Sequence, residues 1–234
     1  MAYKVLIPQD IATEGKEFLV KQGYEIKMGT GAAEEDLIRD VEDCDAILLR
    51  TAPVTKAVLE AGKKLKIVAR HGAGYNNVDL DTANELGIWV TNAPDSTTNS
   101  VAEFTLGAIL AASKRTFLLS KALKENNFFY KNNHKGVDLI GKTLAVIGFG
   151  RIGRARLGFE MNIIAYDPYA KQENVPDYVK LVDWETAFKT ADFVTLHMPL
   201  TKENHGFIGA KEFGMMKPTA YFINCARGEV VNEP

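Results

Sequence analysis

TLAVIGFGRIG, residues 143–153, joins a largely apolar run of five residues to three glycines in the spacing GxGxxG. The apolar run predicts a buried strand that enters a tight turn. In this spacing the first glycine, Gly148, permits the bend, and the second, Gly150, lets a pyrophosphate approach the backbone. The third, Gly153, lets a following helix pack closely on the strand. The alternative is a glycine-rich turn used only for packing.

A second apolar run, residues 161–166, follows the turn and ends at Asp167, 19 positions after Gly148. A carboxylate at the end of that strand accepts hydrogen bonds from an adenosine ribose diol and repels the 2′-phosphate of NADP. The stretch therefore predicts a site for NAD(H) rather than NADP(H). Arg151 and Ile152 are expected to open the helix under the pyrophosphate, where free backbone N–H groups face the anion. For Arg151 the alternative is a solvated side chain.

The composition is that of an ordinary globular protein, with 46% hydrophobic and 25% charged residues in a chain of 234. A net charge of −2 gives no electrostatic reason to expect nucleic acid or an anionic membrane as partner. Neither a basic-then-apolar leader nor an apolar run of about 18 residues is present, so we expect a cytoplasmic protein. The two cysteines, Cys44 and Cys225, form neither a metal-ligand spacing nor a disulfide framework, and no metal site is expected.

Apolar, strand-like runs alternate with amphipathic stretches in the first part of the chain. The predicted strands are 3–7, 24–28, 46–49, 65–69 and 88–91, and the predicted helices are 14–22, 34–41, 56–61 and 80–86. This alternation predicts a parallel sheet covered on both faces. Ligands of such sheets bind beyond the carboxyl ends of the strands.

Two loops at these strand ends carry candidate substrate-binding residues. The first, RTAPVT, begins with Arg50, whose guanidinium fork matches carboxylate or phosphate oxygens. The alternative is an exposed arginine at a strand end. In the second, RHGAGYNNVD, Gly72 and Gly74 bracket Ala73, so backbone N–H groups could point at a carboxylate. A turn glycine without a ligand is the alternative there.

The segment NAPDSTTN, residues 92–99, consists of turn formers and caps and is predicted to connect two domains. Beyond it we predict a long helix from Ser100 to about Lys124, with room for a break. The further predicted elements are irregular segments at 126–141 and 168–180, helices at 184–189 and 210–215, and strands at 193–196 and 220–223. His197 and Arg227 follow these last two strands, so both are expected at the same carboxyl edge as Gly148.

Several separated motifs agree. GFGRIG with YDP, LHMPLT, INCARGEVV, RHGAGYNNVDL and SVAE together resemble the D-2-hydroxyacid dehydrogenases, and within them the D-3-phosphoglycerate dehydrogenase-like branch. The resemblance implies an α/β protein of two doubly wound parallel-sheet domains. These are a flavodoxin-like substrate domain, residues 1–98, and a Rossmann NAD-binding domain, residues 99–234, whose C-terminal part is missing. It also implies NAD-dependent interconversion of a small anionic D-2-hydroxy acid, similar to phosphoglycerate, and its 2-oxo acid, by a homo-oligomer, a dimer or tetramer.

The resemblance assigns roles to individual positions. Arg227 matches the catalytic arginine that pairs with the carboxylate and carbonyl oxygen of the 2-oxo acid. It would hold the carbonyl carbon against the nicotinamide and stabilise the negative charge that develops there. The other matches are Cys225 and Ala226 beside the nicotinamide, Asp167 at the ribose, His197 and Met198 beside the dinucleotide, Ala73 and Gly74 at the substrate carboxylate, and Arg50 at its far anionic group.

The chain also departs from the family pattern. The family's proton relay is a histidine held by a glutamate, both well after the arginine, but only seven residues follow Arg227 here. His71, His197 and His205 are not assigned as substitutes. The missing tail is expected to leave an unpaired sheet edge, and the helix after Gly153 to be about one turn shorter. We expect an incomplete chain that binds NAD but turns over poorly. The alternative is a non-catalytic NAD(H)-binding regulatory protein of the same fold.

Overall fold

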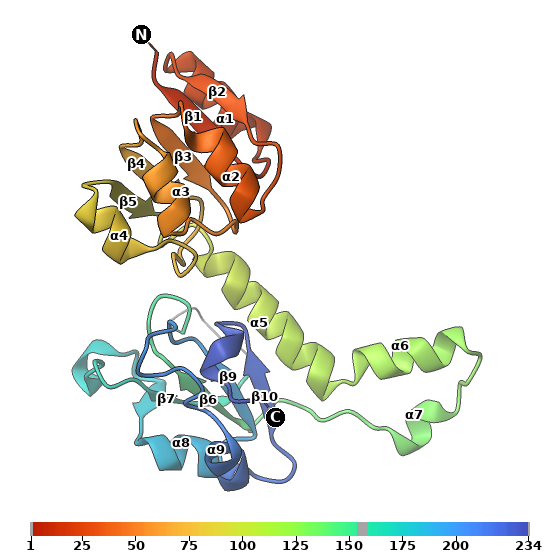
Figure 1. The fold of residues 1–234 in the computed structure, drawn as a ribbon. Coiled ribbons are helices and arrows are strands. Elements are labelled where there is room, and N and C mark those ends of the chain that lie inside the picture. Colours follow the sequence, from red (N-terminus) through yellow and green to blue (C-terminus); the bar gives the residue numbers. More distant parts are fainter. Residues whose placement is uncertain (1, 154–158, 234) are drawn as a thin grey trace. The chain divides into compact units, whose positions relative to one another are not determined.

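The computed structural model describes residues 2–153 and 159–233. The chain forms two compact units, Met1–Thr97 and Thr98–Pro234 (Figure 1). Each unit is built on its own sheet of five strands, and every strand pair in both sheets is parallel. The predicted α/β class with two doubly wound sheets is therefore confirmed.

In the first unit, strands and helices alternate as the sequence predicts. The strands are β1 (Lys4–Ile7), β2 (Glu25–Met28), β3 (Ala46–Leu49), β4 (Ile67–Arg70) and β5 (Trp89–Asn92), and the helices are α1 (Thr13–Lys21), α2 (Glu34–Val41), α3 (Lys56–Ala61) and α4 (Leu80–Glu85). The strand order β2-β1-β3-β4-β5 is the flavodoxin-like order. Apolar positions at helical spacing in α2, α3 and α4 bring Leu37, Leu59 and Ala83 into one core with Leu49 and Val68 of the sheet.

The other face of this sheet is less completely covered. Helix α1 contacts β2, and a hollow of about 310 Å³ lies over half-buried residues of β3 and β4, among them Leu48 and Ile67. Trp89 of the edge strand β5 is 74% exposed. Because parallel sheets normally bury both faces, the described helices cover this face only in part.

The second unit has a different strand order. Its strands are β6 (Thr143–Ile147), β7 (Asn162–Tyr166), β8 (Val179–Leu181), β9 (Phe193–Leu196) and β10 (Tyr221–Asn224), and its helices are α5 (Thr98–Ser113), α6 (Thr116–Lys124), α7 (Tyr130–Asn133), α8 (Trp184–Thr190) and α9 (Ala210–Met215). The strand order is β10-β9-β6-β7-β8. In this order the first strand of the unit, β6, has β7 and β8 on one side and β9 and β10 on the other, which is the Rossmann order. Strand β6 therefore lies at the centre, and the connection from β8 to β9 reverses the direction of winding.

Successive residues of β6 face opposite cores, as expected for a buried central strand. Leu144 and Val146 pack with Ile109 of α5, whereas Ala145 and Ile147 pack with Phe188 of α8. This two-sided burial explains why the run TLAVI is almost continuously apolar rather than alternating.

Three predictions of local structure need correction or comment. Strand β8 lies partly in the segment 168–180 that was expected to be irregular, because three residues give too little periodicity and pairing with β7 decides the outcome. The short helix α7 lies in the segment 126–141 that was also expected to be irregular. The predicted break in the long helix falls at Arg115, which has a φ of 53°.

The predicted shortening of the helix after Gly153 falls on residues 154–158, outside the described residues, while residues 151–153 form a turn. Among the described residues, no helix combines the length and the apolar character needed to cross a membrane.

Candidate functional site

The three glycines of the first motif occupy three different environments. Gly148 has a φ of +90°, and a Cβ atom there would lie 2.9 Å from the backbone carbon of His197 and 2.9 Å from the nitrogen of Met198. At Gly153 a Cβ atom would lie 2.5 Å from the carbonyl oxygen of Gly148. At Gly150 it would meet no atom of the described residues within 4 Å. Packing therefore requires the first and third glycines, whereas the second leaves open space where a pyrophosphate can approach the backbone.

Asp167 follows β7 and is bound to the glycine turn. Its Oδ2 accepts a hydrogen bond of 2.9 Å from the backbone N–H of Phe149, and its Oδ1 accepts one of 2.8 Å from that of Tyr169. The half-buried carboxylate is thus held at the edge of the turn. Each carboxylate oxygen keeps acceptor capacity beyond these bonds, which a ribose diol can use.

His197 follows β9, directly beside the glycine turn. Its backbone N–H donates to the carbonyl oxygen of Ile147 at 2.7 Å, and its Nε2 lies 3.0 Å from the hydroxyl of Thr195. The Nδ1 atom is buried and has no hydrogen-bond partner among the described residues. Burial lowers the pKa of His197 to about 4, so the ring is neutral near pH 7 and cannot serve as a proton donor there.

Arg227 lies in the loop that follows β10, and the amide of Asn224 shapes this loop. The Oδ1 of Asn224 accepts from the backbone N–H of Ala226, its Nδ2 donates to the carbonyl oxygen of Arg227, and both bonds measure 2.9 Å. The guanidinium Nη1 of Arg227 donates to the carbonyl oxygen of Ala226, also at 2.9 Å. Cys225, Ala226 and Arg227 are all half-buried.

The strand register places these loops in one row. Asn224 of β10 is level with Leu196 of β9, Leu196 with Ile147 of β6, and Ile147 with Tyr166 of β7. The structure thus collects the positions predicted in the second unit at one carboxyl edge: Gly148, Gly150, Arg151, Ile152, Gly153, Asp167, His197, Met198, Cys225, Ala226 and Arg227. This edge includes the point where the winding reverses, which is where ligands of such sheets bind.

The positions predicted in the first unit lie on two loops that are joined to each other. Val54 and Val78 form a parallel bridge, and the Nδ2 of Asn77 donates to the carbonyl oxygen of Ala52 at 2.7 Å. From the end of β1, the Oε1 of Gln9 accepts from the backbone N–H groups of Thr51 and Ala52, each at 2.8 Å. The loops after β1, β3 and β4 are therefore braced together at the carboxyl edge of the first sheet.

Arg50 and Ala73 each use part of their hydrogen-bonding capacity within this edge. The exposed Arg50 donates from Nη1 to the carbonyl oxygen of Asp10 at 3.0 Å. The carbonyl oxygen of Ala73 accepts from the Nδ2 of Asn92 at 2.7 Å, so this side of the Ala73–Gly74 loop is fixed by the end of β5.

Arg70, at the end of β4, is a further arginine at this edge that was not among the predicted site residues. A Cβ atom at Gly72, which has a φ of +134°, would lie 1.9 Å from the Nη1 atom of Arg70, so glycine is required for the guanidinium to lie against this loop. Arg70 also donates to the carbonyl oxygen of His71. The signal that marked Arg50, an arginine at the end of a predicted strand, applies equally to Arg70.

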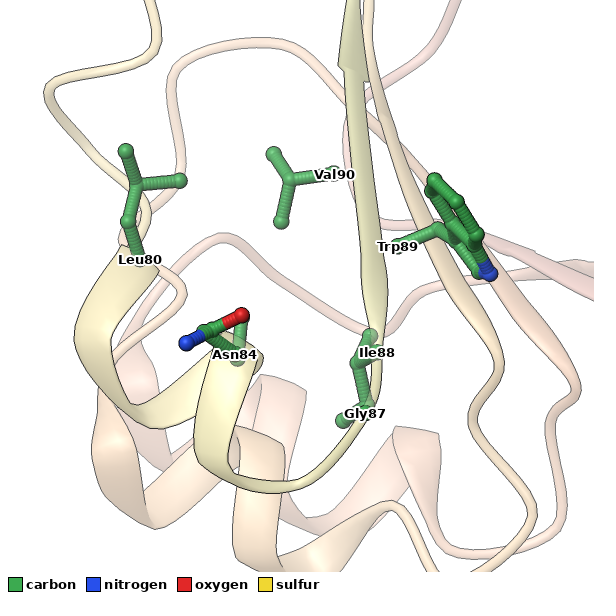
Figure 2. Close-up of a pocket in the computed structure, with 7 residues that line it drawn as sticks. Leu80, Asn84, Gly87, Ile88, Trp89 and Val90 are labelled. Carbon is green, nitrogen blue, oxygen red and sulfur yellow. The ribbon is translucent and has the colours of Figure 1, made fainter.

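A cavity of about 390 Å³ lies elsewhere in the first unit, between α4 and β5 (Figure 2). Leu80, Asn84, Ile88, Trp89 and Val90 are among its lining residues, and the ring of Trp89 points to the other side of the strand. It adjoins the beginning of β5, away from the carboxyl edge, and none of its lining side chains is charged. The cavity therefore lacks the groups that an anionic substrate needs.

Comparison with known proteins gives a consistent result. Residues 106–234 match the model of the D-isomer specific 2-hydroxyacid dehydrogenase NAD binding domain. A D-3-phosphoglycerate dehydrogenase of Methanocaldococcus jannaschii is 40% identical over 98% of this chain and 45% of its own length. A hydroxypyruvate reductase of Thermotoga maritima is 37% identical over 99% of this chain and 76% of its own length.

Solved structures agree. A D-lactate dehydrogenase from Aquifex aeolicus, complexed with NAD and lactic acid, has a TM-score of 0.85 and 28% sequence identity, covering 98% of this chain and 70% of that one. The chain spans less than half the length of the D-3-phosphoglycerate dehydrogenases that it matches.

The close approach of Gly148 to β9 predicts a difference between two glycine substitutions. Gly148→Ala should lower the free energy of unfolding of the second unit by about 1 to 3 kcal/mol, because it forces a positive φ and a backbone clash. Gly150→Ala, in open space, should change it by less than about 0.5 kcal/mol. Urea unfolding followed by Trp184 fluorescence in a Trp89→Phe background measures the second unit selectively. Equal losses in the two variants would contradict this account.

The buried ring of His197 predicts a pH dependence. Its pKa is lowered from 6.5 to about 4 in the folded protein, so the unfolded chain binds the proton more readily. The associated stability is present above pH 6.5 and is lost as the pH falls toward 4, about 3 kcal/mol by pH 4. His197→Gln should show a correspondingly smaller loss between pH 7 and pH 4 in urea unfolding. Parallel pH profiles for the variant and the wild type would rule this out.

Proposed function

The chain belongs to the D-isomer specific 2-hydroxyacid dehydrogenases, and on this premise we propose that it binds NAD(H) and takes part in interconverting a D-2-hydroxy acid and its 2-oxo acid. One observation carries the proposal. The glycine turn, Asp167 and the loop of Arg227 follow β6, β7 and β10, and because the strands of this sheet are parallel, all three lie at its carboxyl edge. This edge therefore offers space for a dinucleotide and, in Arg227, a guanidinium that can bind an acid.

The residues present at this edge fit NAD(H). Gly150 leaves space beside the backbone, and the carboxylate of Asp167 is fixed where the second strand ends. When bound, the nicotinamide supplies the hydride acceptor or donor. We assign Gly148, Gly150, Arg151, Ile152 and Gly153 to the pyrophosphate turn, Asp167 to the ribose, and His197, Met198, Cys225 and Ala226 to the border of the dinucleotide.

Arg227 is proposed as the catalytic residue. Its guanidinium binds the carboxylate and the carbonyl oxygen of the 2-oxo acid, which orients the carbonyl carbon and stabilises the negative charge that develops on the oxygen. His197 is not an imidazolium acid near neutral pH, since its pKa is about 4. Proton transfer is therefore not assigned to His197.

The first unit is proposed to hold the acid, with residues 1–98 as the substrate domain and residues 99–234 as the NAD-binding domain. Ala73 and Gly74 receive the carboxylate, and Arg50 receives a far anionic group. D-3-phosphoglycerate dehydrogenases and a hydroxypyruvate reductase are among the relatives. Of the substrates that these names indicate, a phosphorylated acid has the second anionic group that Arg50 would bind. Neither the described residues nor the comparisons favour the alternative of a non-catalytic NAD(H)-binding protein. A cytoplasmic location stays a prediction.

We also propose a homo-oligomer formed through α5, α6 and the segment before α7. Large apolar side chains lie exposed along these elements, Phe104 at 72%, Phe117 at 79%, Leu123 at 56% and Phe129 at 79%. Helix α6 contacts α5 and α7 (Figure 1). Large exposed apolar side chains on elements that contact one another are typical of an interface between protein chains.

The NAD(H) assignment is tested at Asp167. Asp167→Asn keeps an acceptor for the N–H of Phe149 but removes the charge. We expect about tenfold weaker NADH binding and stronger NADPH binding, because the repulsion of a 2′-phosphate is lost. Titration of nicotinamide fluorescence measures both dissociation constants. Unchanged NADH binding without any gain for NADPH would refute the assignment, and a wild-type chain that binds neither dinucleotide would refute the proposed function.

The substrate class is tested at Arg50. Arg50→Ala should weaken the binding of 3-phosphoglycerate to the NAD-bound protein about tenfold, while D-lactate, which lacks the phosphate, should bind as before. Calorimetry with each acid measures the two affinities. If both acids lose affinity equally, or neither does, Arg50 does not contact the far anionic group.

The interface is tested by placing charge in it. Phe117→Glu and Phe129→Glu should each shift the protein toward the monomer, because a buried unpaired carboxylate is costly. Phe18→Glu, on α1 at 61% exposure, is a matched control that should leave the mass unchanged. Analytical ultracentrifugation measures the mass. A wild-type protein that is monomeric at all concentrations would exclude the interface.

A further inference from the structure

We propose that Asn224 is the positioning residue for Arg227, and that its amide sets the direction of the guanidinium that binds the 2-oxo acid. This inference rests on the proposed function and adds to it a residue with no direct contact to the substrate. Asn224 is the last residue of β10, and it stands three positions before Arg227.

Three hydrogen bonds link the amide to the guanidinium. The Oδ1 of Asn224 accepts a hydrogen bond from the N–H of Ala226, and its Nδ2 donates one to the carbonyl oxygen of Arg227. Between these two points lies the peptide that joins Ala226 to Arg227. The carbonyl oxygen of that peptide, on Ala226, accepts from the Nη1 of Arg227. The amide therefore fixes the peptide plane, and the plane in turn directs the guanidinium.

The ends of the loop are anchored independently of Asn224. Upstream, Ile223 and Asn224 pair with β9. Downstream, Val230 is fully buried and Val231 forms a parallel bridge with Ile208. Loss of the Asn224 side chain should therefore leave the path of the chain intact and release the peptide at Ala226.

A carboxamide suits this position for an electrostatic reason. It offers a donor and an acceptor together without carrying charge. A carboxylate in its place would attract the guanidinium of Arg227 and compete with the substrate's carboxylate. Because Asn224 is exposed, its hydrogen bonds contribute little to overall stability.

The chain supplies a control in Asn204. Its amide also braces a loop, the one after β9, but it bonds to residues that precede it, and its Nδ2 contacts the Sδ of Met198 at 3.7 Å. Its Oδ1 accepts from the N–H of Thr201 at 2.7 Å, and its Nδ2 donates to the carbonyl oxygen of Pro199 at 2.6 Å. Neither bond involves the loop of Arg227. Asn204→Ala thus removes the same chemical group from a neighbouring loop of the same unit.

The test is a double-mutant cycle on ligand binding, which does not require turnover. Wild type, Asn224→Ala, Arg227→Ala and the double variant are each saturated with NADH and titrated with oxamate, a small analogue of a 2-oxo acid. We expect Asn224→Ala to weaken oxamate binding about tenfold, because a misdirected guanidinium loses its paired contact. In the Arg227→Ala background the same substitution should have less than a twofold effect. Asn204→Ala, saturated with NADH like the other variants, should bind oxamate like the wild type.

Two results would overturn the inference while leaving the proposed function standing. One is unchanged oxamate binding in Asn224→Ala. The other is an equal further loss in the Arg227→Ala background, which would show that Asn224 acts by another route. Hydrogen exchange at the Ala226 amide gives a check without any ligand, since Asn224→Ala should accelerate it and Arg227→Ala should not. A wild-type chain that binds no NADH would instead remove the proposed function, and this inference with it.

Discussion

The site depends on how closely the backbone at Gly148 approaches the end of β9. A side chain at this position would meet the backbone of His197 and Met198. Because β6 lies at the centre of the second sheet, this contact brings the turn after the first strand against the loop after the fourth, where the winding reverses. Asp167 then closes the other side of the turn through the N–H of Phe149. The ring of His197, at the same strand end, is itself buried, and this burial lowers its pKa to about 4.

Neutral amides brace the loops at the carboxyl edges of both sheets. Gln9, Asn77 and Asn92 hold loops of the first unit, and Asn204 and Asn224 hold loops of the second. Each side chain offers a donor and an acceptor and so satisfies backbone groups that turns leave unpaired. A carboxylate in these places would only accept hydrogen bonds and would repel an acid, whereas an ammonium or guanidinium would only donate and would itself bind an acid. Rigid loops are thus obtained without disturbing the electrostatics of an anion site.

Several charged groups lie at these edges, and they are divided between the two units. Arg227 belongs to the second unit, Arg50 and Arg70 belong to the first, and Asp167 stands at the far side of the glycine turn. Arginines suit a substrate with carboxylate or phosphate oxygens, and a carboxylate suits a ribose diol. Since Arg50 already donates to the carbonyl oxygen of Asp10, its guanidinium is partly oriented before any acid arrives.

The sequence by itself determined the fold class, nearly all the strands and helices, and the order of motifs along the chain, because periodicity and glycine spacing are local properties. It did not show β8, whose three residues become a strand only by pairing with β7. It indicated Arg227 through family resemblance. It did not show that the amide of Asn224 bonds to the backbone on both sides of the Ala226–Arg227 peptide, or that the absence of a side chain at Gly72 leaves space for Arg70. Those contacts depend on which strands become neighbours and in what register. Only the tertiary structure decides this, because hydrogen bonds between separated segments leave no period in the sequence.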